Sequence, residues 1–514
     1  MKGVPDPIPR IIDTGDREWT NKHHTFTTPV QALYDVLNPD LGDQLAEYLQ
    51  TTKALQAVIA DAIEDETTVR MLGGGWSFSE VAATAGRMYN TKPLNLYFRM
   101  APERLDPAYD GDAAHLWFVQ CGNQIAELSR KLRAEGQSLR TTGASNGQTI
   151  IGAASTGTHG SALDVGAIQD YVVGLHLITG PDRHIFLQRQ SRPVVVEAFA
   201  TRLGATLVSD DRLFNAALVS LGGFGIIHGA LIETDDLFLL QMFRRRMPFD
   251  AALRHAVTTL DFSGLTLPRP ERPYHFEVVI NPYDLDGGAY VTTMYRDPFH
   301  AGYPPPKPKG AMAPGDNALA LIGALTDAIP AVIPKLVKAL TKSTYSLYPK
   351  GITGTIGEIF SATTTTGKAA GCAIGLPLEH AAAAVDIALR IIRDQGPFAA
   401  IVALRFVKGT DATLGFTRFK PHTCILDLDG ALSSRTMQFY SLMWAGLVAA
   451  GIPFTLHWGK IVGLTPTVVN AFYGAAADEW RQARDELLDP DTRKVFASRF
   501  LVTAGLADQG FFPT

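Results

Sequence analysis

The sequence has little cysteine and no long run of one charge. Its three cysteines, Cys121, Cys372 and Cys424, are widely spaced and odd in number, which argues against a disulfide framework and fits a reducing compartment. The net charge is −5, and Arg244–Arg246 is the only tight basic run, so we expect neither nucleic acid nor an anionic membrane as a partner. The first residues lack the apolar core of a signal peptide, so a cytoplasmic location is expected.

Several catalytic signatures are also missing. No Cys, His and Asp residues have metal-ligand spacing, so we expect no metal, and no Gly-x-Ser-x-Gly nucleophile elbow is present. Neither a Gly-x-Gly-x-x-Gly turn leading into a helix nor a Gly-Lys-Ser/Thr phosphate loop occurs. No internal repeat is found. A chain of 514 residues exceeds the roughly 250–300 residues that one core supports, so two domains are expected.

Glycine and small hydroxyl residues are concentrated in one stretch instead. Residues 143–161 read GASNGQTIIGAASTGTHGS, with Ile150 and Ile151 as the only large apolar side chains. Glycines let the backbone approach a ligand closely, and consecutive N–H groups form a concave nest for phosphate oxygens. The stretch therefore indicates a polyanion site, the alternative being an ordinary glycine-rich turn between strands.

Two further glycine clusters flank this stretch along the chain. Residues 71–79, MLGGGWSFS, follow an expected short strand at 67–70, so these glycines lie at a strand end. Residues 220–227, SLGGFGII, lead into an apolar run. Near the end of the chain, residues 457–460 read HWGK.

In this order the motifs resemble the FAD-binding domain of the vanillyl-alcohol oxidase/p-cresol methylhydroxylase flavoprotein family, and within it the aldonolactone and alditol oxidase branch. The segment STGTHGS at 155–161 is nearly identical to the family's ATGTHGS, the HWGK motif matches the branch, and His275-Phe276-Glu277 is similar to the start of its substrate domain. The resemblance implies an α+β fold. A two-subdomain FAD-binding module would span 1–235, a cap with an antiparallel sheet flanked by helices 236–445, and a segment returning to the FAD-binding domain 446–514.

The resemblance also implies which residues hold FAD. They are Gly73, Gly74, Gly75, Trp76 and Ser77 in the first loop, Gly143, Ala144, Gly147, Thr149, Gly152, Ser155, Thr156, Gly157, Thr158, His159 and Gly160 in the second, and Gly225, Ile226 and Ile227 in the third. Many family members carry, at the position of Trp76, a histidine that is bonded to the flavin. Since tryptophan cannot form that bond, we expect non-covalent FAD, with Trp76 packed beside the flavin or the pyrophosphate.

The implied activity is an FAD-dependent oxidase that transfers a hydride from an alcohol, or a related C–H donor, to flavin N5 and passes the electrons to O2. Lys460 and Arg405 match cations of the branch that suit a reduced flavin or a bound alkoxide, the alternative for Arg405 being a salt bridge across the sheet. His457 is the candidate general base, or else a structural hydrogen-bond partner that orients the strand of Lys460. His159 is expected to fix the second loop.

Two departures from the branch bear on the substrate. Ala403 stands where the branch has a glutamate, two residues before the arginine, and Ala144 replaces a serine. We therefore expect a substrate less polar than a sugar alcohol. Two alternatives remain open: a dehydrogenase with a non-oxygen acceptor, and a flavoprotein with non-redox chemistry of the lyase or isomerase type.

The pattern of apolar residues predicts several elements. Helices are expected over 42–63 and 379–393, and a hairpin over 170–179 with its turn at 180–182. Residues 301–310 read as a proline-rich loop. The apolar segment 318–342 is interrupted by Asp327, Pro330 and Pro334, which argues against a transmembrane helix. We expect short cap helices there, the alternative being a lipophilic lid or a monotopic membrane contact.

Overall fold

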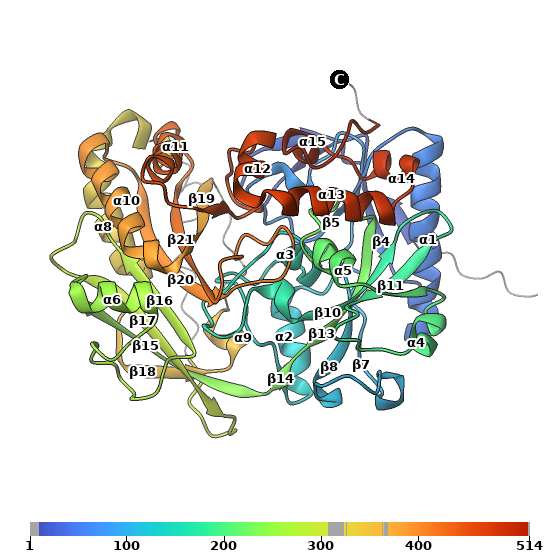
Figure 1. Cartoon of the computed structure of the whole chain (residues 1–514), viewed down its shortest axis with the longest axis horizontal. Coiled ribbons are helices and arrows are strands. Elements are labelled where there is room, and N and C mark those ends of the chain that lie inside the picture. Colours follow the sequence, from blue (N-terminus) through green and yellow to red (C-terminus); the bar gives the residue numbers. More distant parts are fainter. Residues whose placement is uncertain (1–9, 307–322, 325, 362, 364–367, 512–514) are drawn as a thin grey trace, which may run out of the picture.

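The fold was analysed in a computed structural model, which describes residues 10–306, 323–324, 326–361, 363 and 368–511. Figure 1 shows two regions side by side. One contains two sheets and most of the first 235 residues, and the other is built on one large sheet from the middle of the chain. The dark-red C-terminal helices lie over the first region, which they reach after leaving the second.

The first region contains a four-stranded and a six-stranded sheet. The four-stranded sheet has the order β1 (Arg10–Asp13), β4 (Ala32–Leu37), β6 (Arg87–Asn90), β5 (Val69–Leu72). The six-stranded sheet has the order β12 (Thr206–Ser209), β11 (His184–Gln188), β10 (Val172–Ile178), β13 (Ile226–Glu233), β8 (Leu116–Gln120), β7 (Tyr97–Arg99). One apolar core joins both sheets to the C-terminal helices.

Helix α1 (Gln44–Glu64) shows why this region folds as it does. Asp43 caps it, because its side chain accepts hydrogen bonds from the N–H groups of Leu45 and Ala46. Its apolar residues recur at helical spacing and bury Leu55 and Ile59 completely in the common core. The helix predicted over 42–63 is confirmed.

The second region is an eight-stranded sheet in which every neighbouring pair is antiparallel. Its order is β18 (Tyr348–Gly354), β15 (Phe238–Met247), β17 (Ala289–Pro298), β16 (His275–Ile280), β20 (Ala400–Lys408), β21 (His422–Ala431), β19 (Ala369–Pro377), β22 (Thr455–Leu456). Helices α6 (Ala251–Thr259), α10 (Ala381–Gln395) and α11 (Ser434–Ala449) bury one face of the sheet. The expected antiparallel sheet flanked by helices is confirmed.

The two faces of this sheet differ in chemistry, because side chains alternate along a strand. Val278, Leu404 and Leu426 belong to the apolar core under the helices. Their strand neighbours on the opposite face include Glu277, Arg405 and Asp427. The sheet therefore presents a charged surface on the side away from its helices.

Shorter elements complete the described part of the chain. They are β2 (Glu18–Thr20), β3 (Thr27–Pro29), β9 (Gln137–Ser138), β14 (Asp235–Asp236), α2 (Ile125–Ala134), α3 (Ile150–Ala154), α4 (Glu197–Arg202), α5 (Asp211–Leu218), α8 (Ile333–Thr344), α9 (Ile356–Ile359), α12 (Pro466–Tyr473), α13 (Ala475–Leu487), α14 (Pro490–Val495) and α15 (Arg499–Thr503). Helix α13 packs on α5, and α14 packs on α1.

Other expected elements are also found. The hairpin is formed by β10 and β11, and the helix expected over 379–393 is α10. Part of the apolar segment 318–342 lies outside the described residues, and its described end forms α8. Residues 301–306 form a loop, while 307–310 lie outside the described residues. None of the described helices is long and apolar enough to span a membrane. The domain boundaries near 235 and 445 stay a prediction.

Candidate functional site

A cavity of about 420 Å³ lies where the three glycine clusters meet the charged face of the large sheet. All three candidate catalytic residues, Arg405, His457 and Lys460, line it. Fifteen of the nineteen residues predicted to bind FAD line it as well, namely Gly73, Gly74, Gly75, Trp76, Ser77, Gly143, Ala144, Thr149, Gly152, Ser155, Thr156, Thr158, His159, Gly225 and Ile227. Gly147, Gly157, Gly160 and Ile226 do not line it.

The first glycine loop follows β5 and offers a series of free N–H groups. Among the described residues, none of the N–H groups from Gly73 to Ser77 has a hydrogen-bond acceptor. A Cβ on Gly73 would come within 2.3 Å of Thr149 Oγ1, and a Cβ on Gly74 within 2.5 Å of the Gly147 carbonyl oxygen. Only glycine therefore lets the first loop lie this close to the second and leave its N–H groups free for an anion.

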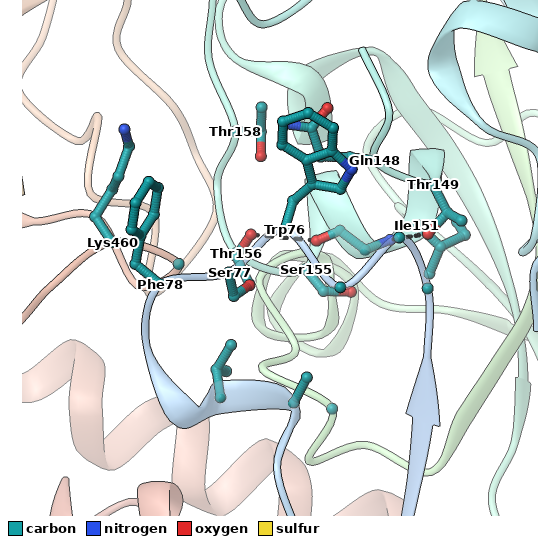
Figure 2. Close-up of a pocket in the computed structure, with 18 of the residues that line it drawn as sticks. Trp76, Ser77, Phe78, Gln148, Thr149, Ile151, Ser155, Thr156, Thr158 and Lys460 are labelled. Carbon is teal, nitrogen blue, oxygen red and sulfur yellow. Dashed lines mark hydrogen bonds between the residues drawn. The ribbon is translucent and has the colours of Figure 1, made fainter. Parts of the chain in front are cut away.

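The second loop supports the first one through Thr149 and Gly147. Thr149 caps the short helix α3, because its hydroxyl accepts a hydrogen bond from the Gly152 N–H. Gly147 lies behind Trp76, so it contributes by leaving space for the indole and not by facing the cavity. Figure 2 shows Trp76 beside Gln148, with Ser155 and Thr156 along the same wall.

The third cluster is tied to both loops by polar contacts. The Ser220 hydroxyl donates a hydrogen bond to Ser155 Oγ at 3.0 Å. Arg70 on β5 donates to the carbonyl oxygens of Leu221 and Gly222 and to Ser498 Oγ. Burial lowers the pKa of Arg70 to about 9. Arg70 also lines the cavity. The sequence did not predict it as a site residue, because a single arginine inside a strand belongs to no recognisable motif.

Two ion pairs form the opposite wall. Arg405 Nε donates to Asp427 Oδ2 at 2.9 Å, and Lys460 Nζ lies 3.3 Å from Asp429 Oδ1. Burial opposes the charge on Arg405, but Asp427 and then Glu277 outweigh it and raise the pKa of the guanidinium further above its usual value. The salt bridge considered for Arg405 is thus present, and Arg405 faces the cavity as well.

Lys460 is held above an aromatic ring of the first loop. Its Nζ lies 4.9 Å from the centre of the Phe78 ring. Figure 2 shows the two side chains next to each other. His23 stacks on Phe78 at 4.0 Å, and it also lines the cavity. The segment before β3 therefore contributes to the site, which the sequence did not indicate. The turn at residues 457–460, which carries Lys460, is also attached to the first loop, because the Phe78 N–H donates to the Gly459 carbonyl oxygen at 2.8 Å.

His159 and His457, two of the three histidines that line the cavity, are buried and neutral. Burial lowers the pKa of His457 to about 3, and its Nδ1 accepts a hydrogen bond from the Gly459 N–H at 2.9 Å. Burial likewise lowers the pKa of His159, whose Nδ1 lies 3.0 Å from the Gly160 carbonyl oxygen and donates to it. His457 Nε2 then carries the proton of the neutral ring. The bond to Gly459 agrees with the structural role considered for His457.

The geometry of the cavity by itself suits FAD. The cavity joins free N–H groups on glycines, which suit a pyrophosphate, to a wall with two cations, which suits a group that gains negative charge. No group of three or more His, Cys, Asp or Glu side chains able to hold a metal is found within the described residues.

A family model supports the same cofactor, and curated proteins are similar to the chain. Residues 44–186 match a family model described as an FAD binding domain. D-arabinono-1,4-lactone oxidase of Eremothecium gossypii is 29% identical over 197 residues, which are 38% of this chain and 32% of that protein. L-gulono-1,4-lactone dehydrogenase of Mycobacterium tuberculosis is 24% identical over 443 residues, 85% of this chain and 90% of that one.

A solved structure shows the fold. Cholesterol oxidase from B. sterolicum superimposes with a TM-score of 0.69 at 14% identity, covering 98% of this chain and 99% of the other. The chain thus spans nearly all of the mycobacterial relative but aligns with only about a third of the fungal one. The resemblance and the FAD cofactor expected from the sequence are confirmed.

Proposed function

We propose that this chain, whose residues 44–186 match an FAD binding domain, is an FAD-dependent oxidoreductase that removes a hydride from a CH–OH carbon. One observation carries the proposal: a single cavity joins the glycine loops to Lys460 and Arg405. The relatives that support it are named as lactone oxidases and a lactone dehydrogenase.

We assign the pyrophosphate to the N–H groups of residues 73–77 and to Ser155 and Thr156 of the second loop. FAD bound there would supply the acceptor for the hydride. We propose that it is bound without a covalent link, because Trp76 offers no atom for such a bond. Cys121 lines the cavity, but burial raises the pKa of its thiol to about 12, so it is kept protonated and unreactive.

Lys460 and Arg405 would hold the substrate oxygen. Both are cations on the wall that faces the first loop, and their carboxylate partners keep them in place. A cation at a developing alkoxide stabilises it most when water is excluded, and Arg405 is only 12% exposed. Each therefore lowers the cost of removing the hydroxyl proton.

His457 has two roles within this proposal. As a neutral ring with its proton on Nε2, it would offer a hydrogen-bond donor to a bound ligand, and through Nδ1 it fixes the turn that carries Lys460. The pKa of about 3 makes it a weak acceptor for a substrate proton, so positioning is the role that the geometry favours over that of general base.

The acceptor and the substrate are the finer parts of the proposal. We favour O2, and the mycobacterial relative's name keeps a dehydrogenase with another acceptor as the second candidate. The substrate less polar than a sugar alcohol stays a prediction based on Ala403 and Ala144. The free cysteines, Cys121, Cys372 and Cys424, support the proposed cytoplasmic location, because all three are unbonded.

A visible spectrum taken before and after acid precipitation tests the cofactor. Flavin released into the supernatant is expected, and flavin retained in the pellet would contradict the non-covalent assignment. Anaerobic bleaching by alcohols, lactols and sterols then tests the reaction, and re-oxidation in air separates O2 from another acceptor. A protein that no donor bleaches, although dithionite does, would favour the non-redox alternative.

A further inference from the structure

Strand β21 places a carboxylate directly opposite Ala403. In the register of β20 and β21, Ala403 pairs with Asp427, and Arg405 lies two residues farther along on the same face. Asp427 is completely buried. A carboxylate that β20 lacks at position 403 is therefore supplied by the neighbouring strand.

The two oxygens of Asp427 have different surroundings. Oδ2 accepts the hydrogen bond of Arg405 Nε at 2.9 Å. Oδ1 is buried and has no hydrogen-bond partner among the described residues, and it lies 4.0 Å from His159 Nε2. A buried carboxylate with one free oxygen is costly for stability alone, which favours a role at the site.

The contact with Asp427 also determines how Arg405 faces the cavity. The guanidinium is held through Nε, and within the described residues its terminal nitrogens Nη1 and Nη2 donate to no acceptor. Arg405 lines the cavity, so this planar fork is left for a ligand. A guanidinium held at one edge presents the other in a fixed direction.

We propose that Asp427 is a positioning residue of the active site, which holds Arg405 from β21 with its terminal nitrogens toward the cavity and so replaces a carboxylate on β20. The inference rests on the proposed function, in which Arg405 binds the substrate oxygen.

The charge on Asp427 is controlled by groups on every side. Burial and Asp429 raise the pKa of Asp427, Arg405 and Lys460 lower it, and the result is about 6. Glu277 on β16 acts on Arg405, while His159 and His457 face the pair as neutral rings. Above pH 6 the carboxylate is charged and holds Arg405, and below it the proton weakens this hold.

The first test compares Asp427→Asn with Asp170→Asn. Asp170 is also buried with a pKa of about 6, but it does not line the cavity and instead bonds Thr410 and the Ala167 N–H. We expect the rate of flavin reduction by substrate to rise through about pH 6 in the wild type. Asp427→Asn should lower that rate about 10²-fold and abolish the rise, and Asp170→Asn should keep it. An Asp427→Asn enzyme with the wild-type rate and pH profile would overturn the proposal.

The second test needs no substrate. It remains decisive when the proposed reaction is wrong, and also when Asp427→Asn does not fold. Infrared spectra between about pH 8 and pH 5 follow the carbonyl band of buried protonated carboxyl groups. The two single variants assign the bands of Asp427 and Asp170 where they fold. In Arg405→Gln the Asp427 band should appear at higher pH, because its nearest cation is gone, while the Asp170 band stays in place. An unmoved Asp427 band would overturn the proposed coupling.

Discussion

The indole ring of Trp76 occupies the space beside the Cα of Gly147: a Cβ at residue 147 would come within 2.4 Å of Trp76 Cζ2. Gly147 does not line the cavity, so its importance lies in this contact. The indole ring packs the first glycine loop against the second loop, and Figure 2 shows it beside Gln148. The geometry of the pyrophosphate site therefore depends on a steric contact between these two residues.

Gly147→Ala should weaken FAD binding about 5- to 150-fold, since overpacking of this kind costs about 1–3 kcal/mol. Equilibrium dialysis of FAD against the apoprotein measures the effect. Gly302→Ala is the control, because no atom lies within 4 Å of a Cβ there. In a Trp76→Ala background the same alanine should cost little, and an undiminished effect would refute the steric explanation.

Lys460→Gln should slow flavin reduction by substrate about 10²–10³-fold, because it removes a cation from the wall that stabilises the substrate oxygen. Stopped-flow spectrophotometry under nitrogen measures this rate. Lys494→Gln, which breaks a surface pair with Asp491, is the matched control and should leave the rate unchanged. Equal rates for both variants would rule out Lys460 as an active-site cation.

His457→Asn should keep more activity than His457→Ala. The asparagine Oδ1 can accept the Gly459 N–H in place of Nδ1, so the turn that carries Lys460 stays in position. If His457 instead acted as the general base, both variants would lose activity equally, and the pH profile would change in both. Steady-state kcat and KM across pH distinguish the two results.

The buried His228 makes the protein sensitive to acid. Burial lowers its pKa to about 3, from 6.5 in the unfolded chain. Between these values only the unfolded state binds the proton. The contribution of His228 to the free energy of unfolding is therefore fully present above pH 6.5 and falls as the pH drops toward 3, by up to about 1.4 kcal/mol per pH unit. Protonation would also turn His228 Nε2 into a donor facing the amide donor Gln120 Nε2, 2.9 Å away.

Melting temperatures between about pH 7 and pH 4 test this sensitivity. His228→Asn should give a flatter dependence on pH than the wild type, whatever its stability at pH 7. His255→Asn, on an exposed helix position, is the control and should keep the wild-type slope. A wild-type slope in His228→Asn would show that another group causes the acid sensitivity.

The glycine loops could be predicted from the sequence because their chemistry is local. Free N–H groups and close backbone approach need glycines at adjacent positions, so the loops are visible as short motifs. The same motifs could not show which side of each loop faces the ligand. Gly147, Gly157 and Gly160 belong to the matched motif, yet they pack behind the cavity.

The charged wall was predicted only in part, because it depends on strand register. Arg405 and Lys460 were found through their motifs, but Asp427 pairs with Ala403 across 24 positions of sequence. Until β20 and β21 are aligned, nothing distinguishes this aspartate from any other. The loss of a glutamate at 403 was visible in the sequence, whereas the neighbouring carboxylate was not.

The turn at residues 457–460 connects parts of the molecule that the ribosome synthesises at widely separated times. It follows the edge strand β22, contacts the first glycine loop through Phe78, and leads into the helices that cover α1 and α5. During synthesis the first loop leaves the ribosome some 380 residues before this turn. A nascent chain therefore cannot close the cavity until residues 457–460 have been made, so the cofactor site is completed only after every strand of the large sheet has been synthesised.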